Sequence, residues 1–180
     1  MNKARLESFT DAVLAIAMTI MVLQLTPPVD SSFAGLARTG LSLLIYALSF
    51  FAIAIYWKNH HTLFASVEKI NHRILWLNIL LLFVLSLFTF TTAWVDEHWL
   101  AIAPEVLYGL VMLAANTIYF LLSCEVYREN KQKPRWARSA FSISLVAVSL
   151  LLAPIFPPVV VIACLVSLIP WLFFIKKDER

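Results

Sequence analysis

A hydroxyl and a carboxylate, Thr10 and Asp11, stand at the start of the first long apolar stretch of the chain, and no further charge occurs before Pro27. An ionisable group in a membrane-spanning segment is costly unless it is paired, so it marks a site of function or of assembly. A carboxylate also favours the first turns of a helix, where the helix dipole is positive. Spacing alone supports a helix cap and a specific polar network equally. Direct pairing of Asp11 with Arg5, six residues earlier, requires a bent helix start or a neighbouring chain.

Four residues further along this stretch share one face of a helix, because they recur at spacings of three and four. They are Ile16, Thr19, Ile20 and Leu23. Any membrane-spanning helix carries such a stripe. Periodicity alone therefore leaves open whether this face contacts lipid, packs on another helix or lines a pore.

No set of residues in the sequence has the spacing of an enzyme active site. The histidines lie in or beside expected loops, without a serine or cysteine nucleophile at a readable distance; they are His60, His61, His72 and His98. A metal site can be drawn from the histidine pair with Glu68 and His72, but solvated loop histidines are the simpler interpretation. We therefore expect a protein that is not an enzyme and that holds no cofactor or resident metal.

The composition indicates an integral membrane protein. Of the 180 residues, 61% are hydrophobic and 14% are charged, whereas soluble domains average about 45–50% apolar and about 25% charged residues. Cys124 and Cys164 lie in apolar runs and are expected to pack as small core residues. The three glycines, Gly35, Gly40 and Gly109, are too few for a phosphate-binding loop, a GxxxG dimer face or a TVGYG-type filter.

Six apolar segments are each long enough, or nearly so, to cross a bilayer as a helix. Their approximate ranges are 9–26, 34–57, 73–95, 100–124, 137–153 and 156–175. The first carries a charge early and ends without a small-residue cleavage site, so no cleavable signal peptide is expected. Open strands are excluded, since backbone groups in hydrocarbon must be paired. We expect an all-α membrane protein that forms a single domain over residues 1–180, with six transmembrane helices and both chain ends on one side.

Basic residues fall almost entirely on one side of this layout. Arg38 alone lies on the other side, and thirteen lie with the chain ends: Lys3, Arg5, Lys58, Lys69, Arg73, Arg128, Lys131, Lys133, Arg135, Arg138, Lys176, Lys177 and Arg180. Lys and Arg accumulate in cytoplasmic loops, so we expect cytoplasmic termini and insertion in the inner (plasma) membrane. This placement accounts for the net charge of +3 without nucleic acid as a partner. The outer side then holds the carboxylates Asp30, Asp96, Glu97 and Glu105.

Local patterns predict how some segments begin, continue or turn. The stretch Asp30-Ser31-Ser32 is a plausible start for the second helix. The recurrence of Phe64, Val67 and Ile70 predicts that this helix continues past the membrane surface. Hydroxyls at Thr89, Thr91 and Thr92 are expected to bond back to carbonyls one turn earlier. The short connection 154–158 predicts an antiparallel hairpin of the fifth and sixth helices.

These motifs resemble the transmembrane protein 175 family, the endolysosomal potassium channels and their bacterial relatives. The family signature is an Arg, three spacers and Phe-Ser-Asp at the start of an apolar helix. Here it reads Arg5 followed by Phe9-Thr10-Asp11, so Thr replaces Ser and keeps the hydroxyl.

The second and third segments carry a further part of the resemblance. Trp57, His61 and Phe64 are followed by Asn78 early in the third segment, as in bacterial members. A Pro-Phe element expected late in that segment is replaced by Thr89-Phe90. The resemblance covers the first half of the chain by motifs and the remainder by topology.

The resemblance implies a homotetramer in which the first helix of each chain lines a central pore, without a re-entrant filter loop. Ile16, five residues after the motif Asp, would form a hydrophobic constriction. Thr19 or Ile20 and then Leu23 would line the pore beyond it, with a permeating potassium ion near Thr19.

The resemblance also assigns a polar network that holds the first helix. Its members here are Arg5, Thr10, Asp11, Trp57, His61 and Asn78. On these grounds we expect a potassium-permeable cation channel with a hydrophobic constriction, assembled from copies of this chain in the lipid bilayer. Two alternatives stay open: a proton-coupled secondary transporter that uses Asp11 and His61 as a relay, and a structural membrane protein without transport.

Overall fold

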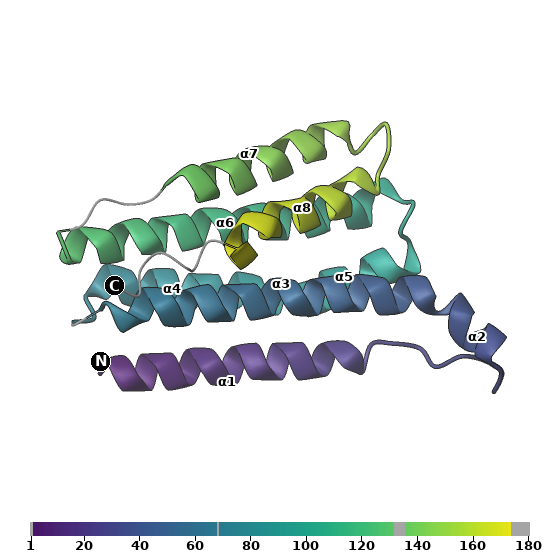
Figure 1. Ribbon diagram of the computed structural model, residues 1–180, viewed down its shortest axis with the longest axis horizontal. Coiled ribbons are helices and arrows are strands. Elements are labelled where there is room, and N and C mark those ends of the chain that lie inside the picture. Colours follow the sequence, from purple (N-terminus) through teal and green to yellow (C-terminus); the bar gives the residue numbers. More distant parts are fainter. Residues whose placement is uncertain (1, 68, 132–135, 174–180) are drawn as a thin grey trace.

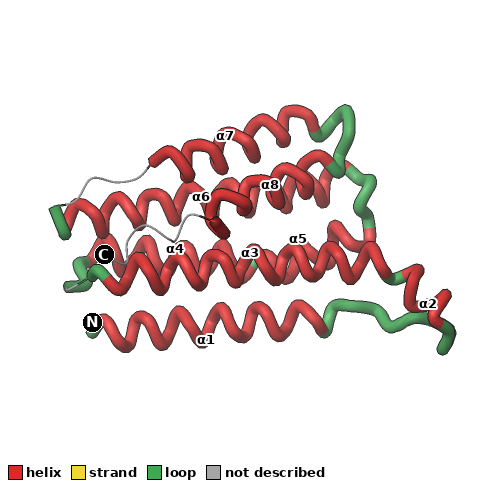
Figure 2. Tube along the Cα trace, in the orientation of Figure 1, coloured by secondary structure: helices red, strands yellow, loops and turns green. Residues whose placement is uncertain are grey.

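The computed structural model describes residues 2–67, 69–131 and 136–173, and in these ranges every regular element is an α-helix (Figures 1 and 2). In chain order the helices are α1 (Lys3–Val22), α2 (Phe33–Arg38), α3 (Gly40–Ala65), α4 (His72–Ser86), α5 (Phe88–Glu97), α6 (Ile102–Glu129), α7 (Trp136–Leu152) and α8 (Val159–Phe173). The all-α class expected from the sequence is confirmed.

Three elements of the described chain are long and apolar enough to cross a membrane. They are α3, α6, and α4 together with α5, which form one candidate span over His72–Glu97. The helices α7 and α8 are apolar but shorter, at 17 and 15 residues. The 20 residues of α1 include Arg5, Glu7 and Asp11 in the first turns, so this helix is long enough but less apolar.

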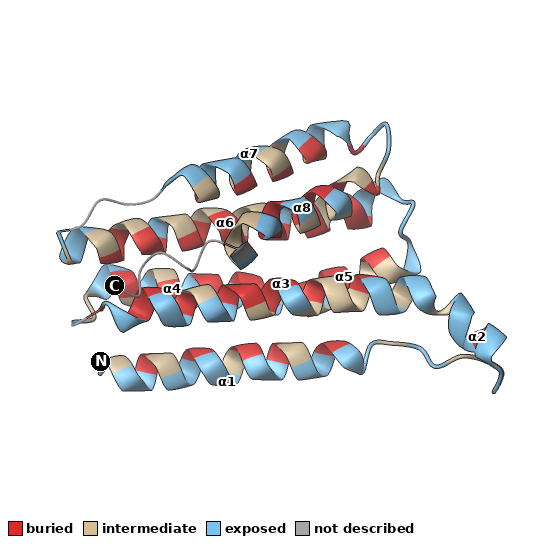
Figure 3. Ribbon diagram, in the orientation of Figure 1, coloured by how far each residue is buried: buried red, intermediate tan, exposed pale blue. Residues whose placement is uncertain are grey.

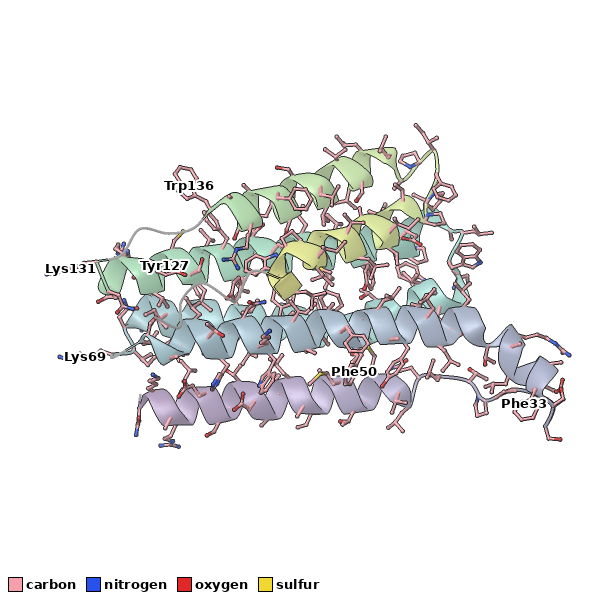
Figure 4. All side chains as sticks on the ribbon, in the orientation of Figure 1. Phe33, Phe50, Lys69, Tyr127, Lys131 and Trp136 are labelled. Carbon is pink, nitrogen blue, oxygen red and sulfur yellow. The ribbon has the colours of Figure 1, made fainter. Side chains whose placement is uncertain are left out.

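The helices pack side by side as a bundle (Figure 1). In it, α6 lies against α4, α5, α7 and α8, whereas α1 packs on α3, α4 and α5 at one edge and α7 forms the opposite edge. Lys69 and Lys131 lie at the same end of the bundle as the N-terminus, and Phe33 lies at the far end (Figure 4). These two loop lysines therefore share one end, which is the arrangement that the charge pattern predicts.

Polar caps fix where three of the helices begin. Asn2, Ser32 and Asn71 precede α1, α2 and α4, and each side chain accepts a hydrogen bond from a backbone N–H of the first turn. Such N–H groups have no partner within the helix, so the caps stabilise these starts. Ser32 starts a helix as expected, but α2 is short, and the Thr39 hydroxyl closes it by donating to the Leu36 carbonyl at 2.8 Å. The predicted segment 34–57 is therefore divided between α2 and α3.

The first helix ends at Val22 and not at residue 26 as predicted. The backbone N–H groups of Leu23 and Gln24 bond to carbonyls only three residues earlier. Such a tightened last turn is common at helix ends. The chain therefore leaves the helix before it reaches Pro27.

The third predicted segment, 73–95, is broken at Leu87 into α4 and α5. On either side of the break, the Ser86 hydroxyl donates to the Phe83 carbonyl at 2.7 Å and the Thr89 hydroxyl donates to the Ser86 carbonyl at 2.8 Å. The expected back-bonding of the hydroxyls is thus present at Thr89, and such bonds bend helices. We attribute the break to this cluster of hydroxyls.

The second predicted helix does extend past residue 57, since α3 continues to Ala65. Phe64 lies on this extension, as predicted, and its side chain is buried. Val67 and Ile70 lie beyond the end of the helix, so for them the helical prediction is wrong.

The predicted hairpin of the last two helices is present, because α7 and α8 pack along each other. A buried serine joins them: Ser142 Oγ donates to the Ser167 carbonyl at 2.9 Å and accepts from Trp171 Nε1 at 3.0 Å. Small side chains allow helices in membranes to approach closely. The predicted span 156–175 corresponds to α8, and its last two residues lie outside the described ranges.

Gly109 of α6 faces this hairpin without room for a side chain. A Cβ there would lie 2.5 Å from Val160 Cγ1 and 2.7 Å from Leu150 Cδ2. We expect Gly109→Ala to lower the free energy of unfolding by about 1–3 kcal/mol, because overpacking forces neighbours to shift. Thermal unfolding of the detergent-solubilised protein measures this. Gly40→Ala is the matched control, since nothing lies within 4 Å of a Cβ there. If Gly40→Ala lowered the free energy of unfolding as much as Gly109→Ala, the packing argument would be contradicted.

Candidate functional site

The two faces of α1 differ in what they contact. One face is buried against α3, α4 and α5, and its residues recur every three or four positions: Leu6, Thr10, Leu14, Ala17 and Met21. The other face lies on the outside of the bundle (Figure 3). Within the described chain, α1 is therefore held from one side.

The exposed face of α1 carries three residues of the stripe seen in the sequence, and the fourth, Leu23, directly follows the last residue of the helix. Ile16, Ile20 and Leu23 are 56%, 43% and 80% exposed, and Thr19 is exposed among them. The Thr19 hydroxyl donates within the helix, with Oγ1 3.0 Å from the Ala15 carbonyl oxygen and 3.0 Å from that of Ile16. A hydroxyl whose proton is used in this way keeps lone pairs that can accept. This face thus combines branched apolar side chains with one hydroxyl oxygen that can accept.

A chain of buried hydrogen bonds joins α1 to α4 and α3. Asn78 Nδ2 on α4 donates to Thr10 Oγ1 at 2.9 Å, and the Thr10 hydroxyl donates to the Leu6 carbonyl oxygen at 2.9 Å. Asn78 Oδ1 lies 2.7 Å from Nε2 of His60 on α3. An amide oxygen can only accept, so His60 Nε2 carries the proton in this arrangement. We call Thr10, Asn78 and His60 the α1 anchor.

The histidine of the α1 anchor is His60, whereas the resemblance assigned His61 to the polar network. His60 is 3% exposed and stacks on Phe64, with ring centroids 4.0 Å apart. His61 is exposed. Consecutive residues of a helix point about 100° apart, and of this pair only His60 is turned into the core. The interpretation of the histidines as solvated loop residues is wrong for His60, whose position four residues after buried Tyr56 was the available signal.

Asp11 takes part in a separate, exposed contact. Trp57 Nε1 donates to Asp11 Oδ1 at 2.9 Å, a bond strengthened by the charge of the acceptor. His61 stacks on Trp57, with ring centroids 6.3 Å apart. Arg5 is exposed, and among the described residues it has no ion pair or hydrogen bond. The six residues of the expected network thus fall into three groups. Thr10 and Asn78 belong to the α1 anchor, Asp11, Trp57 and His61 contact one another in sequence at the surface, and Arg5 has no hydrogen bond or ion pair with either group.

Asp30 lies in the connection between α1 and α2, at the end of the bundle far from the N-terminus. Its Oδ1 accepts hydrogen bonds from the Ser32 hydroxyl and, at 3.0 Å, from the Ser32 backbone N–H. These bonds hold the pKa of Asp30 below its usual range. Arg38 lies 3.4 Å away, as an exposed ion pair. The carboxylate therefore stays charged at this end of the bundle.

Glu105 was predicted to lie on the outer side with Asp30, but it is buried, at 1% exposed. Its Oε2 accepts from the backbone N–H of Val161 at 3.2 Å, in the first turn of α8. The free N–H groups and positive dipole at a helix start favour a carboxylate. Glu105 ties α6 to the start of α8 and is not exposed to attract cations.

No group of three or more His, Cys, Asp or Glu side chains among the described residues is placed to hold a metal ion. Of the metal site drawn from the sequence, Glu68 lies outside the described residues and His72 begins α4. Cys124 and Cys164 are free thiols, and Cys164 is buried as expected of a small core residue.

Substitution separates the roles of the two adjacent histidines. His60→Leu leaves Asn78 Oδ1 without its partner, so we expect the free energy of unfolding to fall by about 1–2 kcal/mol. His61→Leu leaves the α1 anchor intact and is expected to stay within about 0.5 kcal/mol of the unsubstituted protein. Thermal unfolding in detergent compares them. The anchor is assigned wrongly if His61→Leu proves the more destabilising change.

Comparison with known proteins relates this arrangement to one family. Residues 5–89, which include most of α1, all of α3 and the α1 anchor, match the family profile described as endosomal/lysosomal potassium channel TMEM175. A protein of Chryseobacterium sp. (strain P1-3) named as a potassium channel is 40% identical over 188 residues, which cover 100% of this chain and 97% of that protein. The human endosomal/lysosomal proton channel TMEM175 is 34% identical over 92 residues, 44% of this chain and 18% of that protein.

A solved structure is similar over nearly the whole chain. It is the crystal structure of a lysosomal potassium-selective channel TMEM175 homolog from Chamaesiphon minutus. The TM-score is 0.75 at 29% identity, and the match covers 94% of this chain and 95% of that one. The similarity therefore extends well beyond residue 95, where the sequence motifs end.

Proposed function

This chain belongs to the TMEM175 family, and on that premise we propose that it forms a potassium-permeable cation channel whose pore is lined by α1. A relative that matches along its whole length is named a potassium channel. The protein is then not an enzyme, needs no cofactor, and has potassium as its permeant ion.

The observation that carries the proposal is the unequal environment of the two faces of α1. The α1 anchor fixes which face turns inward, and Ile16, Ile20 and Leu23 are left uncovered by the described chain. An apolar face alone also suits lipid. The same helix start, however, exposes Asp11 and Arg5, and charges are costly against hydrocarbon unless they are paired or hydrated. If further copies of the chain surround a water-filled axis, the charges are hydrated or paired there, and the apolar face is removed from lipid by the neighbouring copies.

We propose a homotetramer in which four copies of α1 surround the axis. Each chain then crosses the membrane six times, as α1, α3, α4 with α5, α6, α7 and α8, with cytoplasmic termini in the plasma membrane. In such an assembly Arg5 is free to meet a carboxylate of a neighbouring copy, since six residues separate it from its own Asp11. Opposite charges brought together there would fix the spacing of the copies.

A ring of four Ile16 side chains gives the proposed pore a hydrophobic gate. A narrow apolar constriction excludes water and therefore ions, and a small widening admits both. Beyond it, the Thr19 oxygens offer a partial substitute for the hydration shell of a cation, because their protons are used within the helix. Ile20 and Leu23 continue the lining. Without a filter built from backbone carbonyls, selectivity among monovalent cations is expected to be modest.

A proton-coupled transporter based on Asp11 and His61 is less well supported. The indole of Trp57 lies between them, donating to Asp11 and stacking on His61. An indole N–H donates but has no lone pair to accept a proton, so it does not serve as a relay. The family relationship also favours a channel.

Ile16→Asn is expected to raise potassium flux several-fold, because a polar ring hydrates the constriction and removes the barrier that dewetting presents to ions. Potassium flux into liposomes that contain the purified protein measures the change. Ile162→Asn on α8 is the matched control, since Ile162 is similarly exposed, at 50%, but lies away from α1. Flux that is absent, or equally changed by both substitutions, rules out the proposed gate.

Thr19→Val tests the oxygen ring separately, because it keeps the branched shape and removes the hydroxyl. We expect potassium conductance to fall several-fold in planar bilayer recordings, whereas Thr19→Ser, which keeps the oxygen, should remain close to the unsubstituted channel. Conductance that is unaffected by the loss of the hydroxyl would show that Thr19 does not contact the permeating ion.

A further inference from the structure

A polar side chain without a partner lies inside the bundle, away from α1. Among the described residues, two buried side-chain polar atoms lack a hydrogen-bond partner, Thr92 Oγ1 and Asn116 Nδ2. Asn116 is 5% exposed on α6, and its Oδ1 accepts from the Tyr56 hydroxyl of α3 at 2.8 Å. In this orientation the N–H₂ end of the amide has no partner among the described residues. A buried donor without an acceptor is costly, so a ligand at this position is indicated.

The unpaired amide of Asn116 lines a crevice between α3, α6 and α8. The crevice contains about 220 Å³ of space, part of it open to the surroundings of the bundle. Asn116, Tyr56 and Leu168 are buried at its floor, whereas Asn59 and Trp171 are partly exposed at its rim. The crevice therefore opens at the surface of the bundle, and the free amide lies on its buried side.

The walls of the crevice are mostly apolar and aromatic. Tyr119 meets Tyr56 and Trp171 edge to face, with ring centroids 5.9 and 5.5 Å apart. The polar groups around the crevice are few: the Tyr56 hydroxyl donates to Asn116, and the Asn59 amide donates to the Ile55 carbonyl at 2.8 Å. A single acceptor oxygen on an apolar body matches one free amide donor among apolar and aromatic walls.

The crevice lies toward the end of the bundle that carries Lys69 and Lys131. Asn59 directly follows Lys58 on α3, and Arg138 Cζ lies 5.9 Å from the centre of the Trp171 ring. Tyrosine, tryptophan and basic side chains together mark the level at which a membrane protein meets lipid headgroups. At that level phospholipids carry ester carbonyls, which accept hydrogen bonds, directly above their acyl chains.

We propose that this crevice binds the ester carbonyl of a membrane phospholipid. The carbonyl oxygen accepts from Asn116 Nδ2, and the acyl chain lies along Ile55 and Leu168. A free neutral amphiphile with a ketone or ester presents the same chemistry. The site is separate from the exposed face of α1, and its occupation does not depend on channel activity. Tyr56 precedes His60 of the α1 anchor by one helical turn, so the bound lipid rests against the helix that holds α1.

Photolabelling of the full chain in lipid nanodiscs tests the proposal. One preparation contains a phosphatidylglycerol with two ester linkages and a diazirine on its acyl chain, and a second contains the matched diether lipid, which lacks carbonyls. Mass spectrometry locates the labelled residues. We expect the diester probe to label Ile55, Leu168 or Trp171 several-fold more than the diether probe does.

Substitutions identify the amide as the cause of this difference. Asn116→Leu should reduce diester labelling to the diether level. Leu168→Phe fills the crevice and keeps the amide, and it should also reduce labelling by the diester probe. This variant tests the proposal if Asn116→Leu does not fold. Thr92→Val is the matched control: it removes the other unpartnered polar atom, which does not line the crevice, and labelling should persist.

A photoreactive alkyl ketone added to diether nanodiscs distinguishes the source of the carbonyl. If the free ketone labels the crevice in the unsubstituted protein but not in Asn116→Leu, while the diester lipid does not, the acceptor site stands and its ligand is a free amphiphile. Equal labelling by the diester and diether probes, or the absence of crevice labelling by every probe, overturns the proposal and leaves the amide with no more than a water.

Discussion

The Asn78 side chain is the link between α1 and the rest of the bundle. It donates to Thr10 on α1 and accepts from His60 on α3, so three helices meet at one buried amide. Interhelical hydrogen bonds within membranes are worth about 0.6 kcal/mol on average, which is little beside the packing of whole helices. Their geometry is nevertheless strict, because each donor has one acceptor in reach. The α1 anchor therefore contributes more to the orientation of α1 than to its stability.

That orientation decides what the other face of α1 presents. A rotation of α1 by one residue, about 100°, would remove Thr10 from Asn78 and turn part of the uncovered stripe toward α3 and α4. With the anchor in place, Ile16, Ile20 and Leu23 stay outside, next to the charged start of the helix. In a family of channels this is the face available to line a conduit, and the proposed function follows from the anchor and the family together. The crevice at Asn116 lies on the opposite side of α3, where lipid and not a pore is the proposed neighbour.

The sequence predicted what depends on composition and on spacing along one helix: the all-α class, the extension of α3 past residue 57 and the hairpin of α7 and α8. It failed where the outcome depends on neighbours far along the chain. Glu105 was placed outside because its partner, the Val161 backbone, lies 56 residues away. His60 and His61 could not be told apart, since the choice depends on which of them is turned toward Asn78 on α4. The break at Leu87 arises from hydroxyls that are also common in unbroken membrane helices.

The most direct test of the central claim is the position of α1 relative to the symmetry axis of the assembled protein, measured by electron cryomicroscopy in a lipid bilayer. The account predicts four copies, with Ile16 and Leu23 of each α1 directed toward the axis and Thr10 turned away from it toward Asn78. A map in which Ile16 and Leu23 lie against acyl chains, with α1 away from the axis, would contradict the account.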